Sequence, residues 1–202
     1  MDRGIDRYRK ESEVGKIVIS ENITLDGVVE DPSGDEGLGR GAWVGHVSDR
    51  PAVGKAALDD ALGAEAQLYG RRTYEFLAAR WPSRQGALAD RLNSLPKYVV
   101  SSTLEDPEWK NTTVLNGDPV EEVSKLAQEL DGEIVVPGSI QLARALMEHD
   151  LVDELRLLVF PVVLGAGERL FRETSAPTSL RLVGSRSGDG VAFLTYEPVR
   201  SA

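Results

Sequence analysis

Short apolar runs alternate with segments of helical hydrophobic spacing along the first three quarters of the chain. The apolar runs are brief and rich in β-branched residues, a pattern typical of buried strands. We expect strands at residues 16–20, 66–69, 96–103, 113–115 and 133–136. In the intervening segments apolar residues recur every three or four positions, which predicts helices at residues 49–63, 71–80, 87–95, 120–130 and 139–148.

The last quarter of the sequence has strand patterns without helical spacing. An apolar run extends from Leu155 to Leu164 and is interrupted by Pro161. Residues 180–184 and 191–196 form two further apolar segments, and the turn-rich residues 187–190 between them are typical of a hairpin. Strand–helix alternation followed by strands alone predicts an α/β fold. Its sheet is expected to be mostly parallel, covered by helices, with an antiparallel C-terminal hairpin at one edge.

Features at the segment ends indicate where elements begin and how the chain is divided. Asp49 and Asp118 precede prolines and are expected to cap the helices that follow. Residues 22–45 are rich in Gly, Asp and Ser, so we expect a long loop there, and such loops are often functional. Residues 1–15 are mostly charged and are expected to form a loose tail. Residues 16–200 contain no repeat or clear linker and are predicted to form one domain.

Composition narrows the range of functions. The 202-residue chain is 41% hydrophobic and 28% charged, with a formal net charge of -10. A chain this acidic is not expected to coat nucleic acid, whose binding depends largely on neutralising phosphates. No apolar run approaches the roughly 18 residues of a membrane helix, and no signal segment is apparent, so we expect a cytoplasmic protein with no membrane partner. Cysteine is absent and the two histidines, His46 and His149, are far apart, so no metal site is expected.

Three predicted strands end in segments suited to binding phosphate. Gly70-Arg71-Arg72-Thr73 follows the second strand, Ser101-Ser102-Thr103 the third, and Pro137-Gly138-Ser139 the fifth. Ligands of open α/β sheets bind beyond the carboxyl ends of the strands, so these segments are expected to line one groove. Two of them open helices, whose N-terminal N–H groups and dipoles favour anions. With two arginines added at one helix start, the combination predicts a diphosphate-binding groove.

Five motifs follow one another in a characteristic order between residues 16 and 197. They are Thr24-Leu25-Asp26-Gly27, Gly70-Arg71-Arg72-Thr73-Tyr74-Glu75, Lys97-Tyr98-Val99-Val100-Ser101-Ser102-Thr103, Gly138-Ser139, and Leu151-Val152-Asp153-Glu154-Leu155 running into residues 161–167. This order resembles the dihydrofolate reductase superfamily, most closely the branch related to the reductase domain of bacterial riboflavin biosynthesis. The second and the last motif are the most specific parts of the resemblance.

The resemblance implies an NADPH-dependent reductase with a small heterocyclic substrate, and it suggests a role for each motif. Gly70, Arg71, Arg72 and Thr73 would hold the cofactor phosphates, and Ser101, Ser102 and Thr103 would hold the adenosine 2′-phosphate. Gly138, Ser139 and Ile140 would contact the diphosphate or the nicotinamide side. Thr24, Asp26 and Gly27 would lie in the loop beside the nicotinamide. Related reductases are often dimers and the C-terminal strands offer an edge to cover, so a homodimer is expected.

Asp26 is the motif carboxylate placed near the nicotinamide, and it is the candidate catalytic residue. It could transfer a proton, orient the substrate ring or form an ordinary Asp-Gly turn. The pair of glycines usual at the helix-opening turn is Pro137-Gly138 here. No carboxylate on the first helix fits the pteridine-binding position of folate reductases, which argues against folate as the substrate. The alternative function is a non-catalytic nucleotide- or flavin-binding module on the same fold.

Overall fold

The computed structural model describes residues 14–35, 42–45, 49–172 and 177–200. Most of the predicted N-terminal tail and His46 lie outside these residues. Gly15, at the end of that tail, is attached to the fold, because its N–H donates to the Ala127 carbonyl at 2.7 Å.

Eight strands and five helices form within the described residues, and they correspond in order to the predicted elements. Along the chain they are β1 (Lys16–Thr24), α1 (Pro51–Gly63), β2 (Ala64–Gly70), α2 (Arg71–Ala78), α3 (Ala87–Ser94), β3 (Lys97–Val100), β4 (Thr112–Leu115), α4 (Pro119–Glu129), β5 (Glu133–Pro137), α5 (Ile140–Glu148), β6 (Glu154–Phe160), β7 (Leu180–Gly188) and β8 (Val191–Pro198).

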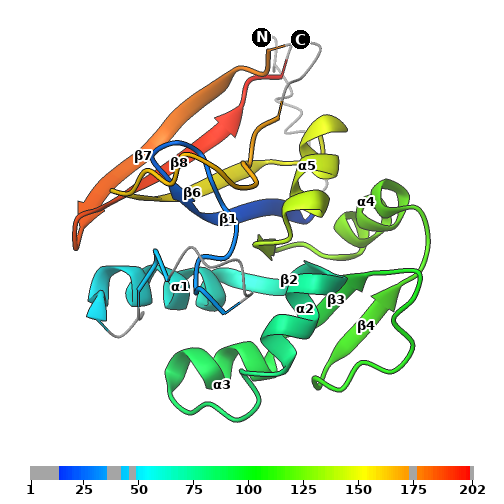
Figure 1. Cartoon of the computed structure of the whole chain (residues 1–202). Helices are drawn as coiled ribbons and strands as arrows, with labels where there is room; N and C mark the ends of the chain where they lie inside the picture. Colours follow the sequence, from blue (N-terminus) through cyan, green and yellow to red (C-terminus); the bar gives the residue numbers. More distant parts are fainter. Residues whose placement is uncertain (1–13, 36–41, 46–48, 173–176, 201–202) are drawn as a thin grey trace, which may run out of the picture.

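The strands form one mixed sheet with the order β4-β3-β2-β5-β1-β6-β8-β7 (Figure 1). The six strands from β4 to β6 run parallel to their neighbours. β8 pairs antiparallel with β6, and β7 pairs antiparallel with β8 at the edge of the sheet. The predicted α/β fold, with a mostly parallel sheet and a C-terminal antiparallel hairpin, is therefore confirmed.

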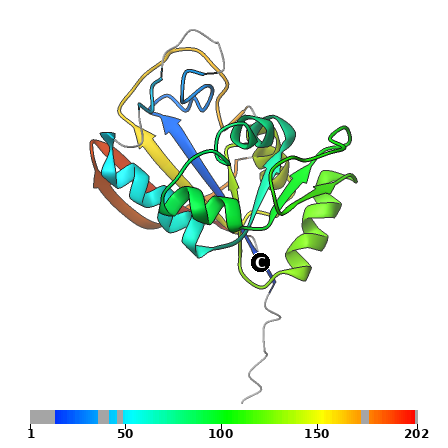
Figure 2. The same ribbon diagram turned by 90° about the horizontal axis from the view of Figure 1, so that it is seen from below.

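Helices cover both faces of the sheet, as Figures 1 and 2 show. Ile17 and Ile19 of β1 lie in the same apolar cluster as residues of α4 and α5. Val18 lies in a second cluster together with residues of α1 and α3. Because successive side chains of a strand point to opposite faces, a strand covered on both sides is expected to carry apolar residues on both of its faces. This explains why the parallel strands appear in the sequence as continuous apolar runs.

A half-buried ion network holds α1 against the sheet. Arg156 of β6 donates to Asp60 of α1 at 3.0 Å, to Glu133 of β5 at 2.9 Å and to Glu154 at 2.6 Å. Ser20 of β1 donates to the same Asp60 carboxylate at 2.7 Å. One guanidinium thus joins three carboxylates from three different elements, and Asp60 is fully engaged in attaching α1.

The two predicted helix caps have different outcomes. α1 begins at Pro51 with Arg50 in the N-cap position and no side-chain cap, so the prediction that Asp49 caps this helix is wrong. Asp118 does cap α4, because its carboxylate accepts from Val120 N at 3.0 Å and from Glu121 N at 3.1 Å.

Several strand boundaries differ from the prediction because pairing with a neighbour decides where a strand ends. β6 stops at Phe160 instead of continuing to Leu164, since Pro161 has no N–H to donate. β1 continues past the predicted residue 20 to Thr24, because it pairs with β6 as far as Phe160. β7 extends to Gly188, which pairs with Val191 across a short turn.

Candidate functional site

The phosphate-binding segments predicted from the sequence lie at neighbouring positions along one edge of the sheet. β3, β2, β5 and β1 are consecutive in the sheet and parallel. Their carboxyl ends therefore bring together residues 101–103, 70–73, 138–140 and 24–27, in that order across the edge. The structure thus assembles all of the predicted site segments at a single location.

The two helix-opening turns are hydrogen-bonded to each other. Gly70 N donates to Ser139 Oγ at 3.0 Å, and Ser139 N donates to Thr73 Oγ1 at 3.1 Å. Gly138 N donates to the Ser20 carbonyl of β1 at 3.3 Å. These bonds hold the start of α2 beside the start of α5. The N–H groups in the first turn of each helix have no intrahelical acceptor, which suits them to bind an anion.

The turn before α5 has an unusual backbone. Gly138 and Ser139 both have positive φ, +60° and +61°. Gly138 tolerates this conformation because it lacks Cβ, and a Cβ at this position would lie 3.4 Å from Thr73 Cγ2. Ser139 has a side chain and is held in the left-handed region, where non-glycine residues are uncommon. Pro137 is the last residue of β5 and keeps its register opposite Ser20.

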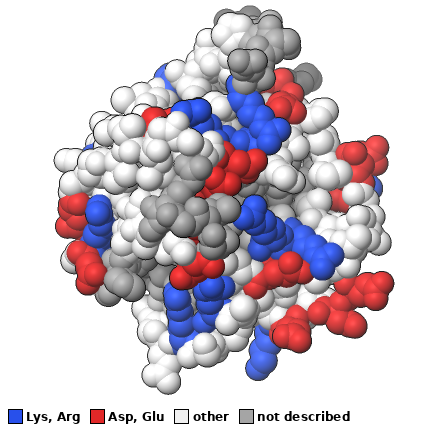
Figure 3. Space-filling model, in the orientation of Figure 1, with Lys and Arg blue, Asp and Glu red and all other residues white. Residues whose placement is uncertain are grey.

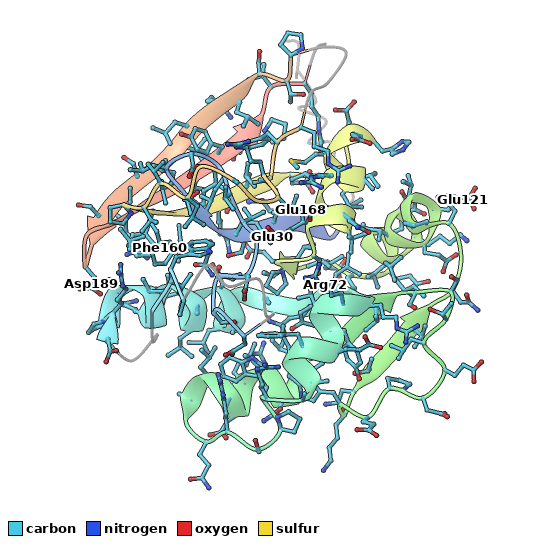
Figure 4. The ribbon with its side chains drawn as sticks, viewed as in Figure 1. Glu30, Arg72, Glu121, Phe160, Glu168 and Asp189 are labelled. Carbon is cyan, nitrogen blue, oxygen red and sulfur yellow. The ribbon has the colours of Figure 1, made fainter. Side chains whose placement is uncertain are left out.

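Arg71, the first residue of α2, contacts the loop after β3. Arg71 Nη1 donates to Thr103 Oγ1, and its Nε donates to Glu75 at 2.7 Å. Ser101 Oγ accepts from Thr103 N at 3.2 Å, which shapes the loop after β3. Arg71 therefore extends over the hydroxyl-rich loop, while Arg72 lies one position further along the helix (Figure 4).

Asp26 is held by its neighbours as an ionised group. Thr24 Oγ1 donates to its Oδ1 at 2.7 Å, Gly165 N donates to its Oδ2 at 2.8 Å and Leu164 N donates to its Oδ1 at 3.2 Å. These hydrogen bonds lower the pKa of Asp26 to about 2, and the bond from Thr24 contributes most. Burial acts in the opposite direction but is outweighed. At neutral pH this carboxylate carries a charge and connects the loop after β1 to the segment after β6.

Residues 25–30 and 164–170 form a pair of adjacent segments that we call the loop pair. Val28 and Arg169 form an antiparallel bridge, and Val29 N donates to the Glu168 carbonyl at 2.9 Å. Glu168 N donates in turn to Glu30 Oε2 at 3.2 Å, and the two glutamates lie near each other in the middle of Figure 4. The segment after β6 therefore supports the loop that carries Asp26, a role that its sequence alone did not reveal.

Sequence reasoning also missed two buried charged residues next to the loop pair, Glu21 and Arg144. Their exposed fractions are 5% and 7%. Burial raises the pKa of Glu21 to about 8, and the charge of Arg144 offsets this in part. The signal was available in the alternation of β1, because Glu21 shares the apolar face of Ile19 and Ile23.

Charge on the face seen in Figure 3 is mixed. Lys and Arg side chains lie intermixed with Asp and Glu side chains there and do not form one basic surface. Such an arrangement suits local recognition of a small anion better than binding along a nucleic acid. In the part of the chain that the structure describes, no helix is long and apolar enough to cross a membrane.

Comparison with known families gives a match over most of the chain. Residues 15–193 match the model of the RibD C-terminal domain family. Two relatives from Bacillus subtilis (strain 168), YyaP and YwjB, are both described as uncharacterized. YyaP is 27% identical over 187 residues, which cover 90% of this chain and 94% of YyaP. YwjB is 29% identical over 129 residues, which cover 64% of this chain and 71% of YwjB.

Solved structures share the fold at low sequence identity. A putative riboflavin biosynthesis protein from Shewanella sp. PV-4 has a TM-score of 0.70 and 21% identity, covering 92% of this chain and 99% of that protein. The diaminohydroxyphosphoribosylaminopyrimidine deaminase/5-amino-6-(5-phosphoribosylamino)uracil reductase of Thermotoga maritima has a TM-score of 0.62 and 17% identity, covering 93% of this chain and 57% of that protein. Dihydrofolate reductase from Enterococcus faecalis, complexed with NADP(H) and RAB-propyl, has a TM-score of 0.61 and 15% identity, with coverages of 93% and 98%.

Proposed function

Because the chain belongs to the RibD C-terminal domain family, we propose that it is an NADPH-dependent reductase that transfers hydride to a pyrimidine- or pterin-like heterocycle. The observation that carries the proposal is the pair of helix starts joined by Gly70, Thr73 and Ser139. Two helix N-termini held side by side, with Arg71 at the start of one of them, suit a diphosphate better than a single phosphate.

The residues along the sheet edge fit the parts of the proposed cofactor. The backbone N–H groups of residues 71–73 and of Ile140, at the starts of α2 and α5, would bind the diphosphate together with the Thr73 hydroxyl. Gly70, Gly138 and Ser139 would hold the two turns in place through their own hydrogen bonds. Ser101, Ser102 and Thr103 would bind the 2′-phosphate together with Arg71, which already contacts Thr103. Hydroxyls and a guanidinium are the donors that a phosphate dianion requires.

At the other end of the groove, Thr24, Asp26 and Gly27 would contact the nicotinamide side. NADPH supplies the hydride when bound, and the protein has to hold the substrate ring against it and exclude water. We assign Asp26 an orienting role, since a carboxylate with a pKa of about 2 holds no proton to donate at neutral pH. Its bonds to Leu164 and Gly165 fix the loop on which it lies.

The first helix supports a pyrimidine over folate as the substrate. Asp60 is occupied by Ser20 and Arg156, and Asp59 pairs with Lys55 on the exposed face of α1. Neither carboxylate is placed to hold a pteridine ring. A pyrimidine of the kind reduced in riboflavin biosynthesis is therefore the preferred candidate substrate.

The test is NADPH oxidation, followed at the nicotinamide absorbance, with a ribosylaminopyrimidinone and dihydrofolate as candidate substrates. Turnover with the pyrimidine and little with dihydrofolate is the expected result. Binding of NADPH without turnover of any heterocycle would favour the non-catalytic nucleotide-binding alternative. A coloured preparation, together with protein fluorescence that is quenched by added flavin but not by NADPH, would favour the flavin-binding alternative.

We further propose that the protein acts as a homodimer joined along β7. β7 is an edge strand, and Leu182 and Val183 on it are 51% and 46% exposed. Unpaired backbone groups next to exposed apolar side chains favour pairing with a second copy of the same strand.

A further inference from the structure

Arg144 connects the cofactor-side helix to the loop pair. It lies one turn after the start of α5 and is 7% exposed. Its Nε donates to the Leu170 carbonyl at 3.1 Å, and its Nη2 donates to the Arg169 carbonyl. Leu170 N donates to the Gly27 carbonyl at 3.1 Å, and Arg169 Nε donates to the Asp26 carbonyl at 2.8 Å. Two hydrogen-bonded steps therefore lead from Arg144 to the loop proposed to contact the nicotinamide.

Glu21 reaches the same region from β1, on the face of the sheet that α5 covers. Among the described residues, Glu21 Oε1 and Arg144 Nη1 are buried side-chain atoms that have no hydrogen-bond partner. Arg144 Nη1 lies 3.9 Å from a Glu168 carboxylate oxygen, beyond hydrogen-bond distance. A buried donor and a buried acceptor, neither with a hydrogen-bond partner, thus lie beneath the loop pair, and the two side chains interact electrostatically.

We propose, on the basis of the reductase function proposed above, that Arg144 is a positioning residue that holds the loop pair against the cofactor turn, and that ionisation of Glu21 releases this hold. Ser139 and Ile140 at the start of α5 belong to the proposed cofactor site, and Arg144 follows them on the same rigid helix. Arg144 therefore links the cofactor turn to the Asp26 loop from the side of the helix, in addition to the pairing of β1 with β5.

The release follows from competition for the guanidinium. Arg144 is faced by Glu21 from β1, by Glu168 and Arg172 from the segment after β6, and by Glu148 from its own helix. Because burial raises the pKa of Glu21 to about 8, Glu21 is neutral at pH 7 and the two carbonyls are the strongest acceptors of Arg144. Above pH 8 the ionised Glu21 carboxylate becomes a charged acceptor for Arg144 Nη1, and bonds of this kind are about twice as strong as neutral ones. Glu21 Oε1 and Arg144 Nη1 are not hydrogen-bonded to each other in the structure, so forming that bond requires the planar guanidinium to move, which draws its Nε and Nη2 away from the two carbonyls.

Hydrogen exchange of the loop pair at pH 7 and pH 9, corrected for the intrinsic effect of pH, tests the proposal without requiring turnover. In the unmodified protein we expect residues 25–30 and 164–170 to exchange about tenfold faster at pH 9, as one charge-assisted hydrogen bond is lost. Glu21→Gln cannot ionise and is expected to keep its protection at pH 9. The matched control is Glu148→Gln, which removes an exposed charge near Arg144 and is expected to behave like the unmodified protein.

The proposal would be overturned if the loop pair of the unmodified protein were equally protected from exchange at pH 7 and pH 9. It would also be overturned if Glu21→Gln lost as much protection at pH 9 as the unmodified protein. Arg144→Met is expected to increase exchange of the loop pair at pH 7 by a similar factor, with NADPH affinity changed less than twofold and kcat lowered. The exchange measurements need neither cofactor nor substrate, so they test the coupling of Arg144 to Glu21 by itself. Absence of NADPH turnover would count against the proposed reductase function only.

Discussion

Replacing Arg71 by Ala tests whether the proposed cofactor site distinguishes NADPH from NADH. Arg71 contacts Thr103 and Glu75, so its guanidinium is held above the loop proposed to bind the 2′-phosphate. The substitution removes that cation and leaves the backbone N–H groups at the start of α2 in place. We therefore expect a loss of affinity for NADPH and almost none for NADH.

The expected loss of NADPH affinity depends on how far solvent reaches the Arg71 side chain. A hydrogen bond to a charged group contributes about 1.5–3 kcal/mol. The Arg71 side chain is 44% exposed, so solvent and salt screening place its contribution at the low end of this range. Since about 1.4 kcal/mol corresponds to a factor of ten in affinity, we expect NADPH to bind about tenfold more weakly to Arg71→Ala.

The assay is quenching of protein fluorescence by each cofactor at fixed ionic strength, using the three tryptophans of the chain as reporters. Arg72→Ala is the matched control, because it removes an adjacent cation from the same helix turn. We expect it to change the affinities for NADPH and NADH by similar, small factors. A loss confined to NADPH in Arg72→Ala, or equal losses for both cofactors in Arg71→Ala, would refute the assignment of the 2′-phosphate to Arg71.

Three further changes test the rest of the site and the assembly. Because the pKa of folded Asp26 is lowered to about 2, its ionised form stabilises the protein above the unfolded pKa of about 3.9. The difference in Tm between the unmodified protein and Asp26→Asn should therefore close as the pH falls from about 4 to about 2, and a constant difference would contradict the role of the charge. Gly138→Ala should lower the free energy of unfolding, measured with urea, by about 1–2 kcal/mol and should also weaken NADPH binding. The control is Gly190→Ala, since Gly190 also has a positive φ but no atom lies near the added Cβ. It should lower the free energy of unfolding by a similar amount without changing the affinity for NADPH. Val183→Asp should halve the mass measured by light scattering, and an unchanged dimer would exclude pairing through β7.

Local patterns predicted most of the elements and the segments that lie side by side at the carboxyl edge of the sheet. The phosphate segments could be identified because each depends on its own sequence, such as the glycine and arginines that follow β2 and the hydroxyls that follow β3. The contacts of Asp26 could not be identified in this way, since its partners Leu164 and Gly165 are 138 and 139 residues further along the chain. The extension of β1 to Thr24 is a similar case, because it results from pairing with β6.

The departure from a pair of glycines at the turn before α5 has a structural explanation. Pro137 occupies the last strand position, where it pairs in register with Ser20, and Gly138 and Ser139 adopt the two left-handed conformations. The left-handed region costs a residue with a side chain about 1–2 kcal/mol. Ser139 offsets this cost through its Oγ, which accepts from Gly70 N, and its N–H, which donates to Thr73. A strained residue whose hydrogen bonds join two helix starts is the arrangement expected of a preorganised phosphate site. Thus Ser139 can take the place of a second glycine while fixing the geometry of the proposed cofactor turn.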